Sequence, residues 1–254
     1  DRATAVIVFA MFIVGLEGAF RYARSRGASA VGALLAAPVF ASSGIFATAP
    51  LLGWINFYGF QLMPWAAFGV RESLRSRFAA GLLTVASMAW VVGFGGTYAG
   101  PLIALLCAFE ALEAAVVNIR RPRAIARVLA VAALWGGLAI AGCSVRLLPI
   151  AETLLAAPRV IADRPGWTWD SIWISLTGEL AFRGSEVSSS SGYFQIGAFM
   201  LPALLAGIFA WRAIPLLLIG GLAGWCATGY AAGWSPFIAL RALPLFSTLR
   251  YPER

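Results

Sequence analysis

The chain has 254 residues, of which 61% are hydrophobic and 12% are charged, and its mean hydropathy is +0.83. A soluble domain carries about 25% charged residues, so this composition excludes an ordinary water-soluble fold, which would lack the polar surface to cover itself. The net charge of +8 rests on 19 basic residues, all of them arginine, and the chain has no histidine. The arginines stand in short loops between apolar runs, which indicates membrane topology and not the binding of nucleic acid.

The apolar residues fall in runs of about 17 to 22, the length that crosses about 30 Å of hydrocarbon as a helix. The runs lack the alternation with period two that barrel strands show. We therefore predict an all-α integral membrane protein, in a bacterial inner membrane, that crosses the bilayer several times. About eight transmembrane helices are expected, at 3–20, 28–49, 54–70, 78–94, 101–117, 128–148, 194–211 and 214–230.

These runs divide the chain into four parts. Residues 1–148 hold the first six transmembrane helices, and residues 149–193 form a polar extracytoplasmic loop. Residues 194–230 hold helices seven and eight. Residues 231–254 form an outer interfacial or re-entrant segment, because three prolines interrupt an apolar stretch that is too short to span.

The basic loops alternate along the chain. With eight spans, eleven arginines fall on one side, which the positive-inside rule makes cytoplasmic; they are Arg21, Arg24, Arg26, Arg71, Arg75, Arg77, Arg120, Arg121, Arg123, Arg127 and Arg212. The long polar loop then lies outside. Its three tryptophans predict an interfacial anchor, a helix lying on the membrane surface, or a platform that stacks on a sugar; they are Trp167, Trp169 and Trp173.

Three carboxylates lie inside expected spans, where a charge is costly and needs an explanation. Glu17 is in the last turn of the first span, and Glu110 and Glu113 share one face of the fifth because they are three residues apart. One interpretation is that they pair with the nearby loop arginines or extend to the membrane interface. The other is a proton or cation site of a transporter.

Two further groups are candidates for binding a lipid phosphate. Arg146 and Glu152 lie at the outer end of the sixth span, where a cation can hold a phosphate while apolar neighbours hold its tail; an ordinary interfacial pair is the alternative. Arg250 and Arg254 end the interfacial segment, and arginine suits bidentate phosphate binding. A connector before another span is the alternative for that segment.

Several chemistries have no motif in the sequence. There is no phosphate-binding GxxxxGK[ST], no GxGxxG between a strand and a helix, and no GxSxG. The three cysteines are isolated, without a CxxC pair, so we expect neither a metal site nor a cofactor.

Residues 243–254 fit the pattern LPxFxxLRxPxR closely, and with it the chain resembles YfhO-like bacterial membrane proteins, which are grouped with the GT-C glycosyltransferases. Three other segments resemble the family in the same order, at 26–30, 148–159 and 192–197. The resemblance covers most of the chain through short motifs.

The resemblance implies an enzyme that transfers a sugar from a polyprenyl-phosphate donor to an acceptor on the extracytoplasmic face. Its general base would be a carboxylate in the first outer loop, a point beyond which this chain starts. The first residue, Asp1, is not a methionine, and we expect a piece of a longer polypeptide whose catalytic residue lies outside it. Arg250, Arg254, Arg146 and Glu152 would then contribute to the lipid-phosphate site.

Two other functions remain open. The chain could be a non-catalytic membrane subunit of a larger complex, which would make neighbouring membrane proteins its partners. It could also be a secondary transporter that uses Glu110 and Glu113, although no internal repeat supports that reading. Under each of these functions, the chain also contacts membrane lipid.

Overall fold

The computed structural model describes residues 2–41, 55–75, 77–93, 99–156, 166–177, 213–231 and 233–242. In these ranges the regular structure is entirely helical, which confirms the all-α class. Three helices are long and apolar enough to cross a membrane: Arg2–Ser25, Ala99–Val117 and Pro122–Thr153. Shorter apolar helices occupy three of the other expected spans, Ala30–Ala41, Phe78–Gly93 and Ile214–Ala227. The count of eight spans stays a prediction.

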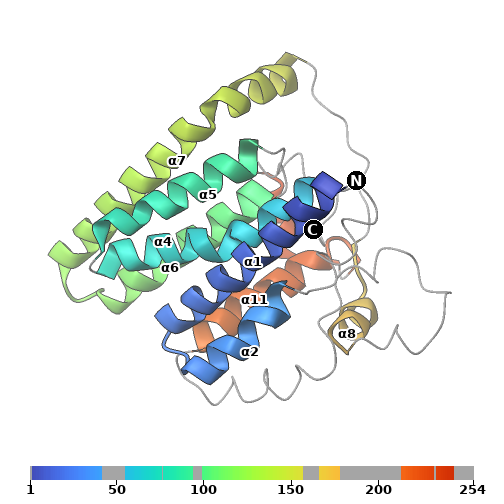
Figure 1. The fold of residues 1–254 in the computed structure, drawn as a ribbon, viewed down its shortest axis with the longest axis horizontal. Helices are drawn as coiled ribbons and strands as arrows, with labels where there is room; N and C mark the ends of the chain where they lie inside the picture. Colours follow the sequence, from blue (N-terminus) through green and yellow to red (C-terminus); the bar gives the residue numbers. More distant parts are fainter. Residues whose placement is uncertain are drawn as a thin grey trace. The chain divides into compact units, whose positions relative to one another are not determined.

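The chain forms two compact units, and the first contains residues 1–42 and 49–157. Its elements are α1 (Arg2–Ser25), α2 (Ala30–Ala41), the 3-10 helix η1 (Ile55–Leu62), α4 (Met63–Arg75), the 3-10 turn η2 (Phe78–Ala80), α5 (Gly81–Gly93), α6 (Ala99–Val117) and α7 (Pro122–Ala156). Helices α2, α1, α4, α5 and α7 are neighbours in that order, and α6 packs against both α4 and α7 (Figure 1).

The corner between α1 and α2 is built by local capping. Gly27 has a φ of 92°, and the N–H groups of Gly27 and Ala28 donate to the carbonyls of Arg24 and Ala23, both at 3.0 Å. This is the Schellman pattern, in which a left-handed glycine ends the helix. Ser29 then caps α2 by accepting a hydrogen bond from the N–H of Gly32 at 3.0 Å. The corner holds Arg26 in a fixed position directly after α1.

Helix α1 packs closely on η1 and α4 through glycines. A Cβ atom on Gly18 would lie 2.6 Å from the ring of Trp65, and one on Gly15 would overlap the side chain of Gln61. Small residues let membrane helices approach without a gap. The approach is close enough for Trp65 Nε1 to donate to the Val14 carbonyl at 2.8 Å.

Helix α7 extends beyond the expected sixth span. The sixth span was expected to end at residue 148, but the helix continues through Pro149 to Ala156. Proline removes one backbone donor and is tolerated in membrane helices where other groups compensate. The first residues of the expected outer loop therefore extend α7.

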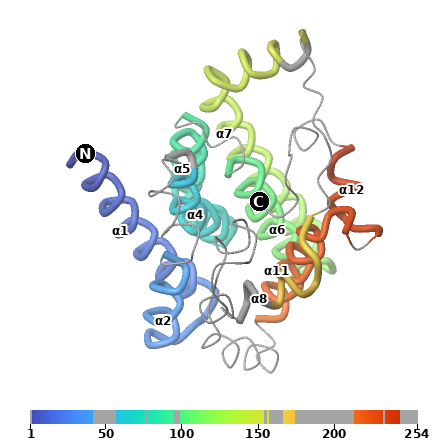
Figure 2. The backbone as a smooth tube through the Cα atoms, turned by 90° about the vertical axis from the view of Figure 1, so that its right-hand side faces the viewer, coloured from blue at the N-terminus to red at the C-terminus, as the bar shows by residue number. Residues whose placement is uncertain are grey.

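The second unit contains residues 43–48 and 158–254. Its described helices are α8 (Trp169–Thr177), α11 (Ile214–Ala227) and α12 (Pro236–Leu240), seen in gold and red in Figure 2. The N–H of Trp167 donates to the Ala227 carbonyl at 3.0 Å, so the start of α8 lies beside the end of α11. Two of the three loop tryptophans, Trp169 and Trp173, therefore lie in a short helix, and each is 56% exposed.

Candidate functional site

Charged residues of three helices meet inside the first unit. We define the buried charge cluster as Tyr22, Arg26, Arg71, Glu110 and Glu113. The two glutamates lie on one face of α6, as their spacing predicted. Because the corner after α1 and helix α4 bring an arginine each to this face, the ends of α1, α4 and α6 meet at one level of the unit.

Glu110 is the centre of this cluster, and its side chain is fully buried. Its carboxylate accepts hydrogen bonds from Arg71 Nη1 at 2.6 Å, from Arg26 Nη1 at 3.1 Å and from the Tyr22 hydroxyl. Glu113 accepts a hydrogen bond from Arg26 and lies 3.7 Å from Arg71. Each carboxylate therefore contacts both guanidinium groups.

The charges of the cluster balance, with two carboxylates against two guanidinium groups. Burial by itself lowers the pKa of Arg26, but the hydrogen bond to Glu113 and the charge of Glu110 outweigh it, so the pKa of Arg26 is raised. Arg26 consequently stays charged. Nearby, Glu17 pairs with Arg21 at 2.6 Å on an exposed surface. Of the interpretations left open for the three glutamates, pairing with nearby arginines is the one that the structure shows.

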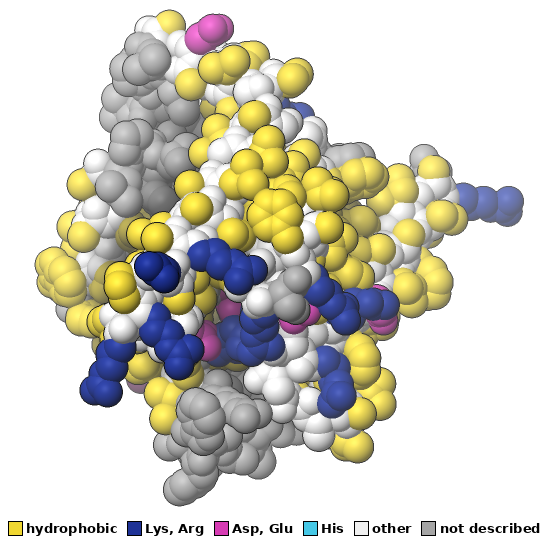
Figure 3. All heavy atoms as spheres, turned by 90° about the vertical axis from the view of Figure 1, so that its left-hand side faces the viewer, with side chains coloured by type: hydrophobic (Ala, Val, Ile, Leu, Met, Phe, Trp, Pro, Cys, Tyr) yellow, Lys and Arg dark blue, Asp and Glu magenta, His cyan; other side chains and the backbone are white. Residues whose placement is uncertain are grey.

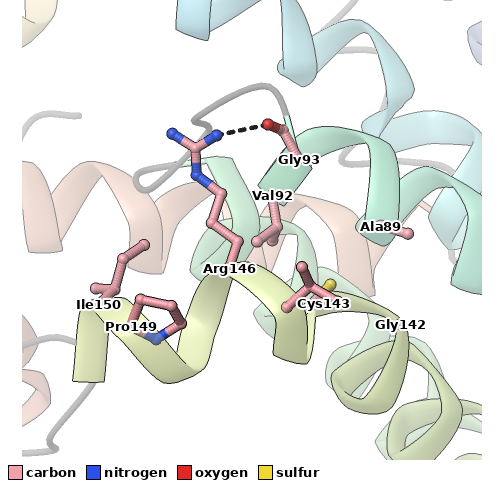
Figure 4. A pocket seen from close by; sticks show the side chains of 9 residues that line it. Ala89, Val92, Gly93, Gly142, Cys143, Arg146, Pro149 and Ile150 are labelled. Atoms are coloured by element: carbon pink, nitrogen blue, oxygen red, sulfur yellow. Dashed lines mark hydrogen bonds between the residues drawn. The ribbon is translucent and has the colours of Figure 1, made fainter. Parts of the chain in front are cut away.

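A second polar position lies at the far end of α5 and α7. The α5–α7 groove has a volume of about 440 Å³ and is lined mainly by apolar side chains of the two helices, among them Val92, Cys143 and Ile150. Arg146 is one of its lining residues and points toward Gly93 (Figure 4), and its Nη1 donates to the Gly93 carbonyl at 2.6 Å. That hydrogen bond satisfies a carbonyl at the C-terminus of α5, where helix carbonyls lack partners within the helix.

The other residues predicted for the lipid-phosphate site do not join Arg146 in the described structure. Glu152 is exposed on α7, and no ion pair joins it to Arg146 within the described ranges. Six residues on a helix turn through about 600°, which puts the two side chains on different faces. Arg250 and Arg254 lie outside the described residues. The structure therefore brings Arg146 to an apolar groove and leaves Glu152 apart from it.

Two parts of these sites were not predicted. Tyr22 was not predicted as a partner of Glu110, although it lies one helical turn before Arg26 and so on the same side of the α1 terminus. The partner of Arg146 was not predicted either, because a backbone carbonyl carries no signal in the sequence. Within the ranges that the structure describes, no group of three or more metal-ligating side chains gathers.

The comparisons with known proteins identify no relative. No family model, curated protein or solved structure matches this chain.

Proposed function

We propose that this chain is part of a membrane glycosyltransferase that uses a polyprenyl-phosphate sugar, and that the α5–α7 groove receives the phosphate end of the donor. The observation that carries the proposal is an arginine, Arg146, in the lining of a mainly apolar groove. The resemblance of the sequence to GT-C proteins supports the same substrate class. We assign no residue of this chain to the general base.

The chemistry of the groove fits both parts of such a lipid. Apolar walls can hold isoprene units, and the guanidinium of Arg146 can donate charge-assisted hydrogen bonds to the phosphate. The known hydrogen bond of Arg146 uses only Nη1. A guanidinium has five N–H donors, so it can hold the Gly93 carbonyl and a phosphate together.

The position of Arg146 along α7 fits a membrane boundary. Arg123 and Arg146 are separated by 23 residues of one helix, which is about 35 Å at 1.5 Å per residue. The hydrocarbon core is about 30 Å thick. If the arginines at the start of α7 are cytoplasmic, Arg146 therefore lies at the extracytoplasmic headgroup region, where a lipid-linked donor would present its sugar.

The buried charge cluster has the properties of a structural contact between helices and does not suit the ion site of a transporter. A proton or cation site needs a carboxylate whose charge can be neutralised by the transported ion. Glu110 and Glu113 are already neutralised by Arg26 and Arg71. The cluster instead holds α1, α4 and α6 together at the end opposite the groove.

The test is binding of a polyprenyl phosphate, with the corresponding polyprenol as the uncharged comparison, to the full chain in nanodiscs of neutral lipid. The wild-type chain should bind the phosphate more tightly than the alcohol. Arg146→Gln should lose about 10- to 150-fold in affinity for the phosphate, because a hydrogen bond to a charged group contributes about 1.5 to 3 kcal/mol. Its affinity for the alcohol should not change.

A groove variant separates the charge from the apolar walls. A Cβ atom on Gly142 would lie 3.7 Å from Ala89, within the groove lining, so Gly142→Leu should fill the groove and weaken both lipids. Arg21→Gln, at an exposed arginine that pairs with Glu17, is the matched arginine control and should leave both affinities unchanged. Equal binding of the phosphate by wild type and Arg146→Gln would refute the proposal and favour a non-catalytic membrane subunit.

A further inference from the structure

We infer that the turn between α6 and α7 binds the headgroups of anionic phospholipids, through Arg120, Arg121, Arg123 and Arg127. This inference does not depend on the glycosyltransferase proposal, because the turn and the Arg146 groove lie at different ends of α7. We call these four residues the turn arginines.

Most arginines on this side of the first unit are already engaged. Arg21, Arg26, Arg71 and Arg77 pair with glutamates, the last with Glu72 at 3.9 Å. Arg24 and Arg75 donate to the carbonyls of Ala28 and Ser25, each at 2.7 Å. Figure 3 shows arginine side chains gathered on one face with hydrophobic side chains beside them.

The turn arginines differ because all four are exposed and none has a carboxylate or carbonyl partner among the described residues. The sequence between Glu113 and Glu152 contains no acidic residue, so neither helix offers a local counter-charge. Arg123 is also in the first turn of α7, where a cation is unfavourable for the helix itself. An external anion would neutralise the turn arginines and offset the unfavourable positive charge at the start of α7.

The turn holds these arginines on a defined backbone. Asn118 Nδ2 donates to the Ala114 carbonyl at 2.8 Å, and the N–H of Arg121 donates to the Asn118 carbonyl at 2.7 Å. Pro122 begins α7 directly afterwards, at the position where proline is favoured in a helix. The backbone that carries the arginines therefore needs little ordering when they bind.

Lipid is the occupant because apolar surface continues from the turn along both helices. Val117 and Ile119 at the end of α6 are 77% and 69% exposed, and Leu129 on α7 is 60% exposed. These side chains suit acyl chains, while the adjacent arginines suit the phosphates of the same lipid molecules. Basic groups beside a membrane-spanning helix attract anionic lipid by about 1 kcal/mol each, which is about fivefold in affinity.

The experiment measures lipid selectivity with the full chain reconstituted in phosphatidylcholine vesicles. Spin-labelled phosphatidylglycerol and spin-labelled phosphatidylcholine report the association of each lipid with the protein by electron paramagnetic resonance. The wild-type chain should prefer phosphatidylglycerol about fivefold or more. Replacing all four turn arginines with glutamine should bring the ratio close to one, and replacing them with lysine should retain part of it, since lysine keeps the charge without the bidentate geometry.

The matched control removes four arginines from the same side that already have partners, Arg21, Arg24, Arg75 and Arg77, and should retain the wild-type ratio. Inorganic phosphate at 0.15 M ionic strength or below should not displace the lipid, because the acyl chains add to binding. Equal loss of selectivity in the control and the turn variant would overturn the inference, since any surface charge would then suffice. No preference in the wild-type chain would also overturn it and would leave the turn arginines to an acidic protein partner.

Discussion

Replacing Glu110 should destabilise the first unit more than replacing any exposed glutamate. Glu110→Gln keeps the shape of the side chain and removes its charge. The side chain is fully buried and accepts hydrogen bonds from Tyr22, Arg26 and Arg71. After the substitution, Glu113 is the one carboxylate of the buried charge cluster left to balance two guanidinium groups.

The size of the effect follows from that imbalance. Removing one partner of a buried ion pair costs about 3 to 5 kcal/mol, because it leaves a buried charge without compensation. Glu113 remains close to both arginines, so we expect the lower end, about 3 kcal/mol. For a chain of this length, 1 kcal/mol shifts the melting temperature by about 2 to 4 °C, which predicts a decrease of about 6 to 12 °C.

The assay is thermal unfolding of the purified chain in one detergent, followed by circular dichroism. Glu17→Gln is the matched control, because Glu17 also pairs with an arginine but both side chains are about half exposed, at 47% and 51%. An exposed pair on one helix contributes about 0.3 to 0.5 kcal/mol. The control should therefore melt within about 2 °C of wild type.

A paired replacement tests the physical cause. In the double variant Glu110→Leu with Arg71→Met, one charge of each sign is removed together, and Arg26 keeps Glu113 as its partner. This double variant should be more stable than Glu110→Leu alone, because an apolar pair of similar volume is often as stable as a buried ion pair. The reasoning is refuted if Glu110→Gln melts like the Glu17→Gln control, or if the double variant is less stable than Glu110→Leu.

Two packing predictions use the same thermal assay. Gly81→Ala should cost about 1 to 3 kcal/mol, since a Cβ atom there would lie 2.1 Å from the buried ring of Trp135. Gly137→Ala on α7 is the control and should not destabilise the protein, because the space around its Cβ is open. Equal melting temperatures of the two variants would contradict the α5–α7 packing. Thr84→Val should cost about 1 kcal/mol, because the buried hydroxyl donates to a carbonyl of α4 at 2.9 Å. Ser144→Ala is the control and should melt like wild type, since its exposed hydroxyl is bonded within its own helix. Equal melting temperatures of these two variants would show that the α4–α5 hydrogen bond does not stabilise the protein.

The sequence predicted the helical class and the ends of several helices because those features depend on local composition. Apolar runs long enough to cross a bilayer favour helices, since backbone groups in hydrocarbon must be satisfied within the segment. The turn that ends α1 is also local, since Gly27 and Ser29 form it, although its capping was not predicted. The continuation of α7 past residue 148 was not predicted, because Pro149 and the polar residues after it indicate a break, and the helix continues past them.

The sequence by itself determined that this protein has apolar helices with arginines at their ends, and that Glu110 and Glu113 share a face. Only the tertiary structure decided which arginines neutralise those glutamates, because Arg26 and Arg71 are 84 and 39 residues away from Glu110 along the chain. It also decided that Arg146 meets the Gly93 carbonyl beside an apolar groove, while the turn arginines keep no such partner in the described part of the chain. The physical reason is that charge and hydropathy are properties of a segment, whereas the partner of a charge depends on how distant helices pack.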